Sequence, residues 1–266
     1  MCFQPGDMTM LLAINANNTN TVFAVFDGDR LRGQWRASTD PRRTADEYVV
    51  WLTQLMSFEG LGRGDIDGAI LSSVVPAAVF NLKLLCRRYF GCEALVVGDP
   101  DCVLGIEVKL DRPEEVGADR VVNAVAAKAR HRTPLIVVDL GTATTFDVVD
   151  RDGNYCGGAI APGINLSLRA LEMAAAKLPH VEIKQVDRAI GKNTVQAMQS
   201  GLYWGYVGLI EGLVTRISNE FGEKMGVVAT GGLVSLFAGA SPLIEAIDPE
   251  LTLWGLYLIY NHNRKT

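Results

Sequence analysis

A turn suited to holding phosphate occurs twice in this chain, each time after an apolar run typical of a buried strand. Backbone N–H groups and hydroxyls in such a turn form a concave donor site for anions. Two of these turns facing each other would hold one nucleotide. The second turn spans residues 139–145. The first consists of Asn15, Ala16, Asn17, Asn18, Thr19, Asn20 and Thr21.

The second turn carries the stronger signal. Asp139 ends an apolar strand, where a carboxylate is expected to meet a cleft and not the core. Gly141 permits a tight bend, and Thr142 supplies a hydroxyl. An ordinary polar hairpin is the alternative interpretation, because Asp and Gly are common in turns.

A second candidate group is the segment Gly117-Ala118-Asp119-Arg120, which begins a predicted helix. Asp119 could accept a proton from a substrate hydroxyl while Arg120 holds an acidic substrate group. The helix dipole alone also favours an acid in the first turn of a helix, so both interpretations stay open here.

Two glycine-rich turns, at residues 157–163 and at Thr230-Gly231-Gly232, each follow a predicted strand. The bare backbone at Gly231 and Gly232 would let an adenine or a ribose lie against the chain, and we expect a helix directly afterwards. Either motif alone is a weak signal, because glycine pairs are frequent at strand ends.

Two successive sets of strands and helices position these turns. Asp27-Gly28 predicts a hairpin, and Thr44 with Glu47 has the spacing of a capping box. In the first set we expect strands at 10–14, 21–26, 30–37, 68–73 and 94–98 and helices at 45–57 and 77–89. A helix at 118–131 then leads to strands at 135–139 and 144–150, which repeat the opening order. The sequence therefore predicts a duplicated α/β fold with a nucleotide cleft between its halves.

A long helix is predicted at 193–221, with two distinct faces. Glycines at positions 201, 205, 208 and 212 recur at steps of three and four residues and would form a groove for another backbone. That backbone could belong to this chain or to a second copy. The expected core stripe consists of Val195, Met198, Leu202, Tyr206, Leu209, Leu213 and Ile217.

Composition narrows the class of protein. The length of 266 residues suits two small domains, and the net charge of −5 argues against a nucleic-acid partner. Five scattered cysteines without a Cys-x-x-Cys pair indicate reduced thiols. No run reaches the ~20 apolar residues that a bilayer span requires, and residues 1–9 lack the pattern of a signal peptide. We therefore expect a cytoplasmic protein without a membrane partner.

Taken together, the motifs resemble those of type III pantothenate kinases. The first turn, the segment at 117–120, the turn at 139–145, residues 157–163, Gly191-Lys192-Asn193-Thr194 and Thr230-Gly231-Gly232 follow the family's order. The resemblance implies two RNase H-like (actin-like ATPase) domains, which we expect at 10–116 and 117–266. It also implies phosphorylation of pantothenate by ATP, the first step of coenzyme A biosynthesis. The implied cofactors are Mg²⁺ and a monovalent cation, K⁺ or NH₄⁺.

The resemblance also implies roles for single residues. Asp119 would be the general base on the pantothenate hydroxyl, in a pocket lined by Gly117, Ala118 and Arg120. Thr194 would reach pantothenate from the neighbouring subunit of a homodimer. Metal binding would fall to Asp139, as the ligand of the monovalent cation. The nucleotide would be bound by Asn15, Ala16, Asn17, Asn18, Thr19, Asn20, Thr21, Thr142, Gly231 and Gly232.

The first turn departs from the family pattern of an acidic residue, a variable residue and then Gly-Asn-Thr. Asn17 replaces the glycine, a mild change because Asn tolerates positive φ. Asn15 replaces the acid, which removes a charge beside magnesium. Besides the active kinase, two hypotheses therefore stay in view. One is a catalytically degenerate paralogue that binds nucleotide or pantothenate in a regulatory role. The other is a kinase or phosphatase of the same superfamily for another small acid.

Overall fold

The computed structural model describes residues 10–174 and 179–264. Residues 1–9, for which the sequence predicts no signal peptide, lie outside the described residues. Within the described ranges, every helix is too short or too polar to cross a membrane. Four of the five cysteines lie in these ranges, and all four are free thiols, as predicted: Cys86, Cys92, Cys102 and Cys156.

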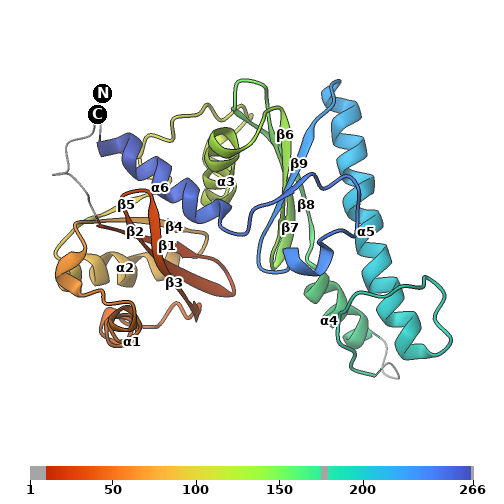
Figure 1. Cartoon of the computed structure of the whole chain (residues 1–266), viewed down its shortest axis with the longest axis horizontal. Coiled ribbons are helices and arrows are strands. Elements are labelled where there is room, and N and C mark those ends of the chain that lie inside the picture. Colours follow the sequence, from red (N-terminus) through yellow and green to blue (C-terminus); the bar gives the residue numbers. More distant parts are fainter. Residues whose placement is uncertain (1–9, 175–178, 265–266) are drawn as a thin grey trace. The chain divides into compact units, whose positions relative to one another are not determined.

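The first sheet has the strand order β3-β2-β1-β4-β5 (Figure 1). Three antiparallel strands come first in the chain, and two further strands then add in parallel to β1. Gly28, with φ of 58°, makes the predicted hairpin between β2 and β3, because such a turn needs left-handed residues. The strands are β1 (Met10–Ala16), β2 (Asn20–Asp27), β3 (Arg30–Ser38), β4 (Gly68–Ser73) and β5 (Ala94–Val96).

Helix α1 (Ala45–Phe58) packs on one face of this sheet and begins with the predicted capping box. The backbone N–H of Glu47 donates to Thr44 Oγ1 at 3.3 Å, and the N–H of Thr44 donates to Glu47 Oε2 at 2.8 Å. These bonds satisfy two of the N–H groups that a helix start leaves without partners, so the sequence fixes where α1 begins.

Helix α2 (Pro76–Leu85) packs on the same face and begins at proline, as predicted. It continues as a wider π-helical turn over Cys86–Phe90 and stops at Gly91, whose φ is 69°. The expected helix at 77–89 is therefore helical throughout but is not a single α-helix.

The opposite face of the first sheet is covered by helices from later in the chain (Figure 1). Trp254 and Tyr257 lie against the ring of Phe26 on β2, with centroid distances of 5.3 and 5.1 Å. The two helices are α3 (Ala118–Arg130) and α6 (Leu251–Arg264). Gly255 of α6 allows close contact with α3, since a side chain at this position would overlap the backbone carbonyl of Val122.

The second sheet repeats the topology of the first. Its order is β10-β9-β6-β7-β8, so β8-β7-β6-β9-β10 corresponds strand by strand to β3-β2-β1-β4-β5. The central strand β6 is antiparallel to β7 and parallel to β9, as β1 is to β2 and β4. This repetition confirms the predicted duplicated α/β fold. The strands are β6 (Leu135–Leu140), β7 (Ala143–Val149), β8 (Tyr155–Pro162), β9 (Gly226–Thr230) and β10 (Ala246–Ile247).

Helix α5 (Thr194–Phe221) packs on the second sheet, but its predicted core stripe is partly wrong. Val195 is 40% exposed and lies outside the core, whereas Met198 and Tyr206 are buried, and the other four expected residues are partly buried against core residues: Leu202, Leu209, Leu213 and Ile217. The centre of the buried face lies about one residue further round, where Tyr203 and Ile210 also enter the core. Apolar residues also occupy positions beside the predicted stripe, among them Tyr203 and Ile210, so the pattern alone left the exact orientation undetermined.

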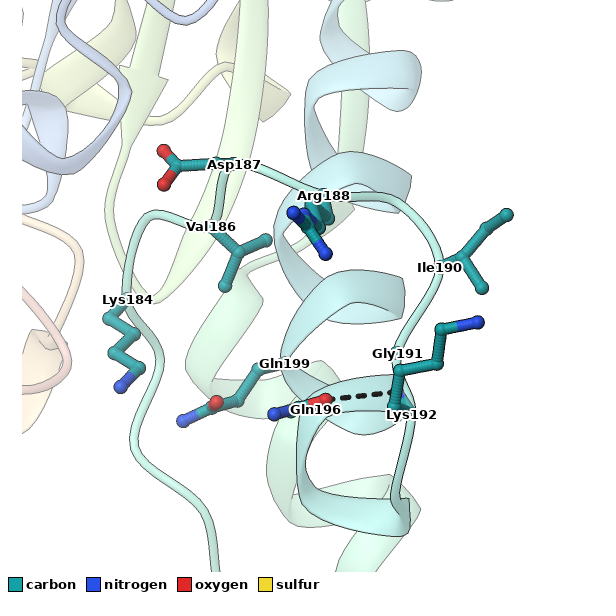
Figure 2. Close-up of a pocket in the computed structure, with 9 residues that line it drawn as sticks. All are labelled: Lys184, Val186, Asp187, Arg188, Ile190, Gly191, Lys192, Gln196 and Gln199. Atoms are coloured by element: carbon teal, nitrogen blue, oxygen red, sulfur yellow. Dashed lines mark hydrogen bonds between the residues drawn. The ribbon is translucent and has the colours of Figure 1, made fainter.

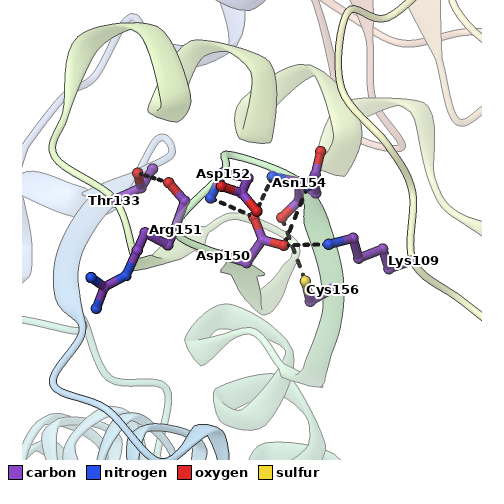
Figure 3. Close-up of polar contacts among 7 residues, drawn as sticks. All are labelled: Lys109, Thr133, Asp150, Arg151, Asp152, Asn154 and Cys156. Carbon is purple, nitrogen blue, oxygen red and sulfur yellow. Dashed lines mark hydrogen bonds and ion pairs between the residues drawn. The ribbon is translucent and has the colours of Figure 1, made fainter.

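The β7–β8 hairpin turn is held by Asp150 (Figure 3). Its carboxylate accepts the backbone N–H groups of Asp152 and Asn154 at 3.0 and 2.8 Å, and Lys109 Nζ lies 2.8 Å away. Burial raises the pKa of Asp150, but Lys109 and Asn154 outweigh that effect and lower the pKa to about 2. This charge is therefore structural, because it ties the segment before α3 to the hairpin.

The described residues divide into two compact units. The first comprises residues 10–107, 112–126 and 252–264, and the second comprises residues 108–111, 127–174 and 179–251. Helix α4 (Ile164–Ala174) belongs to the second unit. The expected domains at 10–116 and 117–266, which describe the internal repeat, stay a prediction.

Candidate functional site

The first phosphate turn connects β1 to β2 in the first unit. The N–H of Asn17 donates to the carbonyl of Asn20 at 3.0 Å, which closes the turn. Thr39, the residue directly after β3, also holds the turn, because its hydroxyl donates to the carbonyl of Asn17 at 2.6 Å. Among the described residues, positive φ occurs only at glycines, so Asn17 is not left-handed and the expected reason for a glycine here is wrong.

Two side-chain oxygens of this turn, Asn15 Oδ1 and Asn17 Oδ1, are buried without a hydrogen-bond partner among the described residues. Asn15 is only 5% exposed. Leaving such an atom unsatisfied costs about 1–3 kcal/mol, so a missing partner is expected. An amide oxygen can only accept, and a magnesium-bound water can donate to it. The turn therefore fits hydrated magnesium beside a nucleotide.

A polar residue that the sequence interpretation missed lies beside this turn. Ser72 on β4 is the in-register neighbour of Asn15 on β1, and its Oγ is also buried without a partner among the described residues. The available signal was its place at the end of an apolar strand, the same signal that identified Asp139.

The predicted base Asp119 lies in the first turn of α3, also in the first unit. Its Oδ1 accepts the backbone N–H of Arg120 at 2.9 Å. Burial raises the pKa of the carboxyl, and Arg120 opposes that shift through its N–H bond and its charge. Asp119 is thus a carboxylate of increased basicity held in one orientation.

Gly117 explains why a glycine precedes this acid. A Cβ on Gly117 would lie 2.7 Å from Asp119 Oδ1, closer than real Cβ contacts. The glycine therefore leaves room for the carboxylate, and its carbonyl accepts the N–H of Arg120 at 3.1 Å. The predicted pocket residue Ala118 is the first residue of α3.

The second phosphate turn lies in the second unit, where β6 and β7 are joined by Gly141 and Thr142 alone. Asp139 is partly buried near the end of β6, with Thr145 of β7 and Thr230 of β9 as its in-register neighbours. This polar row across three strands places the Asp139 carboxylate at the strand ends, as predicted.

The two glycine turns of the second unit converge on the Asp139 turn. A Cβ on Gly231 would overlap Asp139 Oδ1, and a Cβ on Gly163 would overlap the carbonyl of Thr142. Gly231 also has a left-handed φ of 96°, which a glycine adopts freely. The structure therefore brings Asp139, Thr142 and Gly231 together. After Gly232 only a short 3₁₀ turn, Val234–Phe237, follows, so the expected helix there is wrong. A helix cannot start directly after Gly232, because the next backbone N–H, that of Leu233, donates to the carbonyl of Leu140.

The segment Gly191-Lys192-Asn193-Thr194 forms the start of α5. Asn193 caps the helix by accepting the N–H of Gln196 at 2.9 Å, and a Cβ on Gly191 would overlap the backbone of Ala197. Thr194 is exposed at the first helical position. The motif thus has a local structural role in addition to any contact made by Thr194.

A cavity of about 440 Å³ lies between this segment and the preceding loop (Figure 2). Three basic residues and one acid line it, Lys184, Arg188, Lys192 and Asp187, and the Lys192 N–H donates to Gln196 Oε1 at 2.9 Å. None of the predicted site residues is among its lining residues.

The predicted glycine face of α5 is open in this chain. A Cβ on Gly201, Gly205 or Gly208 would have no other atom within 4 Å, and Gly212 meets only the Arg216 guanidinium. The face points away from the core side of the helix. No backbone of the described residues packs in the groove, so the interpretation as an intramolecular crossing is wrong.

No group of three or more His, Cys, Asp or Glu side chains that could hold a metal forms in the described part of the chain. For a monovalent cation, the relevant donors are oxygens, and the Asp139 carboxylate and the Leu140 carbonyl both lie against Gly231. Such a pair of oxygen donors fits a hard cation.

Comparison with known proteins gives a consistent result. A family model for type III pantothenate kinase matches residues 11–216. The chain is 68% identical over 254 residues to the type III pantothenate kinase of Paramagnetospirillum magneticum, covering 96% of this chain and 98% of that protein. It is 64% identical over 255 residues to that of Rhodospirillum rubrum, covering 96% and 99%.

Solved structures with a similar fold are more distant in sequence. Component A of (R)-2-hydroxyglutaryl-CoA dehydratase from Acidaminococcus fermentans matches with a TM-score of 0.55 and 11% identity, covering 97% of this chain and 98% of that one. The ethanolamine utilization protein EutJ from Carboxydothermus hydrogenoformans matches with a TM-score of 0.56 and 16% identity, covering 96% and 92%. At these identities the likeness is one of fold alone.

Proposed function

The chain belongs to the type III pantothenate kinase family, and we propose that it transfers phosphate from ATP to pantothenate with Asp119 as the general base. Pantothenate phosphorylation for coenzyme A biosynthesis is the function of this kinase. The observation that supports the role of Asp119 is its partly buried carboxylate, held by the Arg120 N–H and given room by Gly117.

A carboxylate of raised pKa suits the chemistry. Phosphoryl transfer depends on positioning and charge neutralisation more than on covalent catalysis, so one base and well-placed donors suffice. Asp119 accepts the proton of the pantothenate hydroxyl as that oxygen attacks the γ-phosphorus of ATP, and the bond from this phosphorus to the bridging oxygen breaks to release ADP. The Arg120 guanidinium, with Gly117 and Ala118, holds the acidic end of pantothenate in the pocket.

The proposed nucleotide-binding residues are those of the first phosphate turn, Asn15–Thr21, together with Thr142, Gly231 and Gly232. Magnesium, when bound with ATP, neutralises charge on the phosphates. The orphaned oxygen of Asn15 supports a place for a magnesium-bound water in the first turn.

Asp139 holds the monovalent cation, K⁺ or NH₄⁺. Its carboxylate and the neighbouring Leu140 carbonyl supply the oxygen ligands, and Gly231 leaves the space for them. The cation then fixes the turn that carries Thr142. Equal turnover in potassium, ammonium and sodium salts would remove this cation from the mechanism.

A homodimer completes the pantothenate site in this proposal. The exposed glycine face of α5 supports a close contact with a second copy, and Thr194 lies at the start of the same helix. Thr194 of each subunit then binds pantothenate in its partner. The net charge of −5 supports a protein without a nucleic-acid partner, and the free thiols suit a cytoplasmic, reducing compartment.

The test is an assay of the purified protein with ATP, pantothenate, magnesium and potassium. Asp119→Asn should abolish turnover with little change in melting temperature or nucleotide affinity, because it removes a base and not a packing group. The acid limb of kcat/KM against pH should lie above the ordinary range of an aspartate, since burial raises the pKa of Asp119. Near-normal turnover of Asp119→Asn would overturn this assignment. A wild-type protein that binds pantothenate but never phosphorylates it would favour the regulatory paralogue.

A further inference from the structure

Ser72 is the feature of the first unit that no motif or role above explains. It is the fifth residue of β4, and its side chain is fully buried. Polar residues at the buried end of a strand are normally paired. The Ser72 hydroxyl nevertheless has no hydrogen-bond partner among the described residues.

Asn15 has the same unusual property on the adjacent strand. β1 and β4 are parallel, Asn15 and Ser72 are in register, and neighbouring strands lie about 4.8 Å apart. In-register neighbours project from the same face of a sheet. The flanking residues Ile14 and Ala16 enter the core under α1, so Asn15 and Ser72 lie on the opposite face. Two neighbouring residues near the ends of β1 and β4 therefore each carry an orphaned oxygen on the same face of the sheet.

The chemistry of the two oxygens identifies their common ligand. Asn15 Oδ1 has lone pairs and no proton, so its partner is a hydrogen-bond donor or a cation and cannot be a phosphate oxygen. The Ser72 hydroxyl can accept or donate. Magnesium retains several waters when it binds a nucleotide, and those waters are donors. Residues that hold metal-bound waters commonly control metal affinity without touching the ion.

Building on the proposed function, we infer that Ser72 is a positioning residue for magnesium, holding together with Asn15 one water of the hydrated ion that accompanies ATP. Two neutral oxygens replace the single carboxylate expected at position 15. Ser72 thus compensates in part for the charge that Asn15 lacks. No described residue supplies either oxygen with a hydrogen bond that would stabilise the fold.

Ser72→Ala distinguishes this positioning role from a purely structural one, because the two roles predict opposite changes in the melting temperature. Without ligand, the variant should melt about 2–4 °C higher than the wild type, because a buried unsatisfied hydroxyl is gone. The affinity for ATP in excess magnesium, measured by calorimetric titration, should fall about tenfold. The affinity for ATP in EDTA should not change. Asn15→Ala should weaken magnesium–ATP binding as well, and the double variant should lose less than the two single losses combined, because both oxygens hold one water.

Ser73→Ala is the matched control. The Ser73 hydroxyl donates to the carbonyl of Val75 at 3.1 Å and accepts the Val75 N–H at 3.0 Å, so it is satisfied within the chain. This variant should melt at a lower temperature and keep the wild-type affinity for magnesium–ATP.

Three results would overturn the inference for Ser72. They are a lower melting temperature of ligand-free Ser72→Ala, an unchanged affinity for magnesium–ATP, and an equal loss with and without magnesium. The last result would indicate direct contact with the phosphates. The proposed function fails separately, if the wild type does not phosphorylate pantothenate at all. A wild type that does so while binding ATP equally well with and without magnesium would overturn only the present inference.

Discussion

Gly117→Ala tests whether the position of the Asp119 carboxylate controls turnover. The new Cβ would lie 2.7 Å from Asp119 Oδ1, whereas ordinary contact begins near 3.4 Å. The carboxylate must therefore move by about 0.7 Å. Rotating it away would break its 2.9 Å bond to the Arg120 N–H. Since a misplacement of about 1 Å can cost roughly a hundredfold in rate, we expect kcat to fall at least about tenfold, or about 1.4 kcal/mol.

The assay is steady-state phosphorylation of pantothenate, with melting temperature and ATP affinity measured on the same samples. Both of those should stay near the wild type, because Gly117 is not left-handed and lies outside the core. Gly64→Ala is the control, since a Cβ there meets no atom within 4 Å and its φ is also not left-handed. If Gly117→Ala turns over within about twofold of the wild type, the argument that this carboxylate is the positioned base is refuted.

Three further changes test other parts of the molecule. Gly205→Leu should shift the protein toward monomer in sedimentation and lower its activity, because Thr194 would lose the partner site; a fully dimeric variant would contradict the glycine contact. Asn15→Asp should strengthen magnesium–ATP binding about tenfold and lower the melting temperature without ligand, since a buried carboxylate is costly; unchanged or weaker binding in calorimetry would show that no charge is needed there. Asp150→Asn should lower the free energy of unfolding by about 1–2 kcal/mol at pH 7, allowing for the partly exposed Lys109. The pKa of Asp150 is lowered in the folded state, so this difference should vanish as pH falls from about 4 to about 2; a constant difference in urea titrations across that range would contradict it.

Local signals in the sequence predicted most of the architecture. The Thr44–Glu47 capping box, the hairpin at Gly28 and the strand at 68–73 are all confirmed, because each depends on residues a few positions apart. The repeated turns predicted the duplication, and the matching sheet orders confirm it.

Features that depend on distant contacts were not predictable. The stretch after Gly232 is predominantly apolar, but its backbone bonds to the Leu140 carbonyl and forms only a 3₁₀ turn. The exact buried face of α5 depends on which side chains the second sheet accepts, and apolar periodicity alone placed it about one residue away.

In the candidate site, too, features with a local sequence signal were predicted and features that depend on distant contacts were not. Asp119 and Asp139 were identified from their places at a helix start and a strand end. The reasons for Gly117 and Gly231 became visible only in three dimensions, because each leaves space for a carboxylate that sequence spacing does not reveal. Ser72 was missed because its significance comes from Asn15 on another strand, 57 residues earlier in the chain.

The packing of α6 on the first sheet has a consequence for synthesis. Phe26 is buried against Trp254 and Tyr257, and the N–H of Val103 donates to Asn263 Oδ1 at 2.9 Å. On the ribosome, the part of this sheet face that α6 covers therefore stays exposed until residues 251–264 have emerged. The second unit ends at Leu251, so it can fold while the first is still incomplete. The half that is translated first is completed last, and nascent chains should depend most on chaperones during that interval.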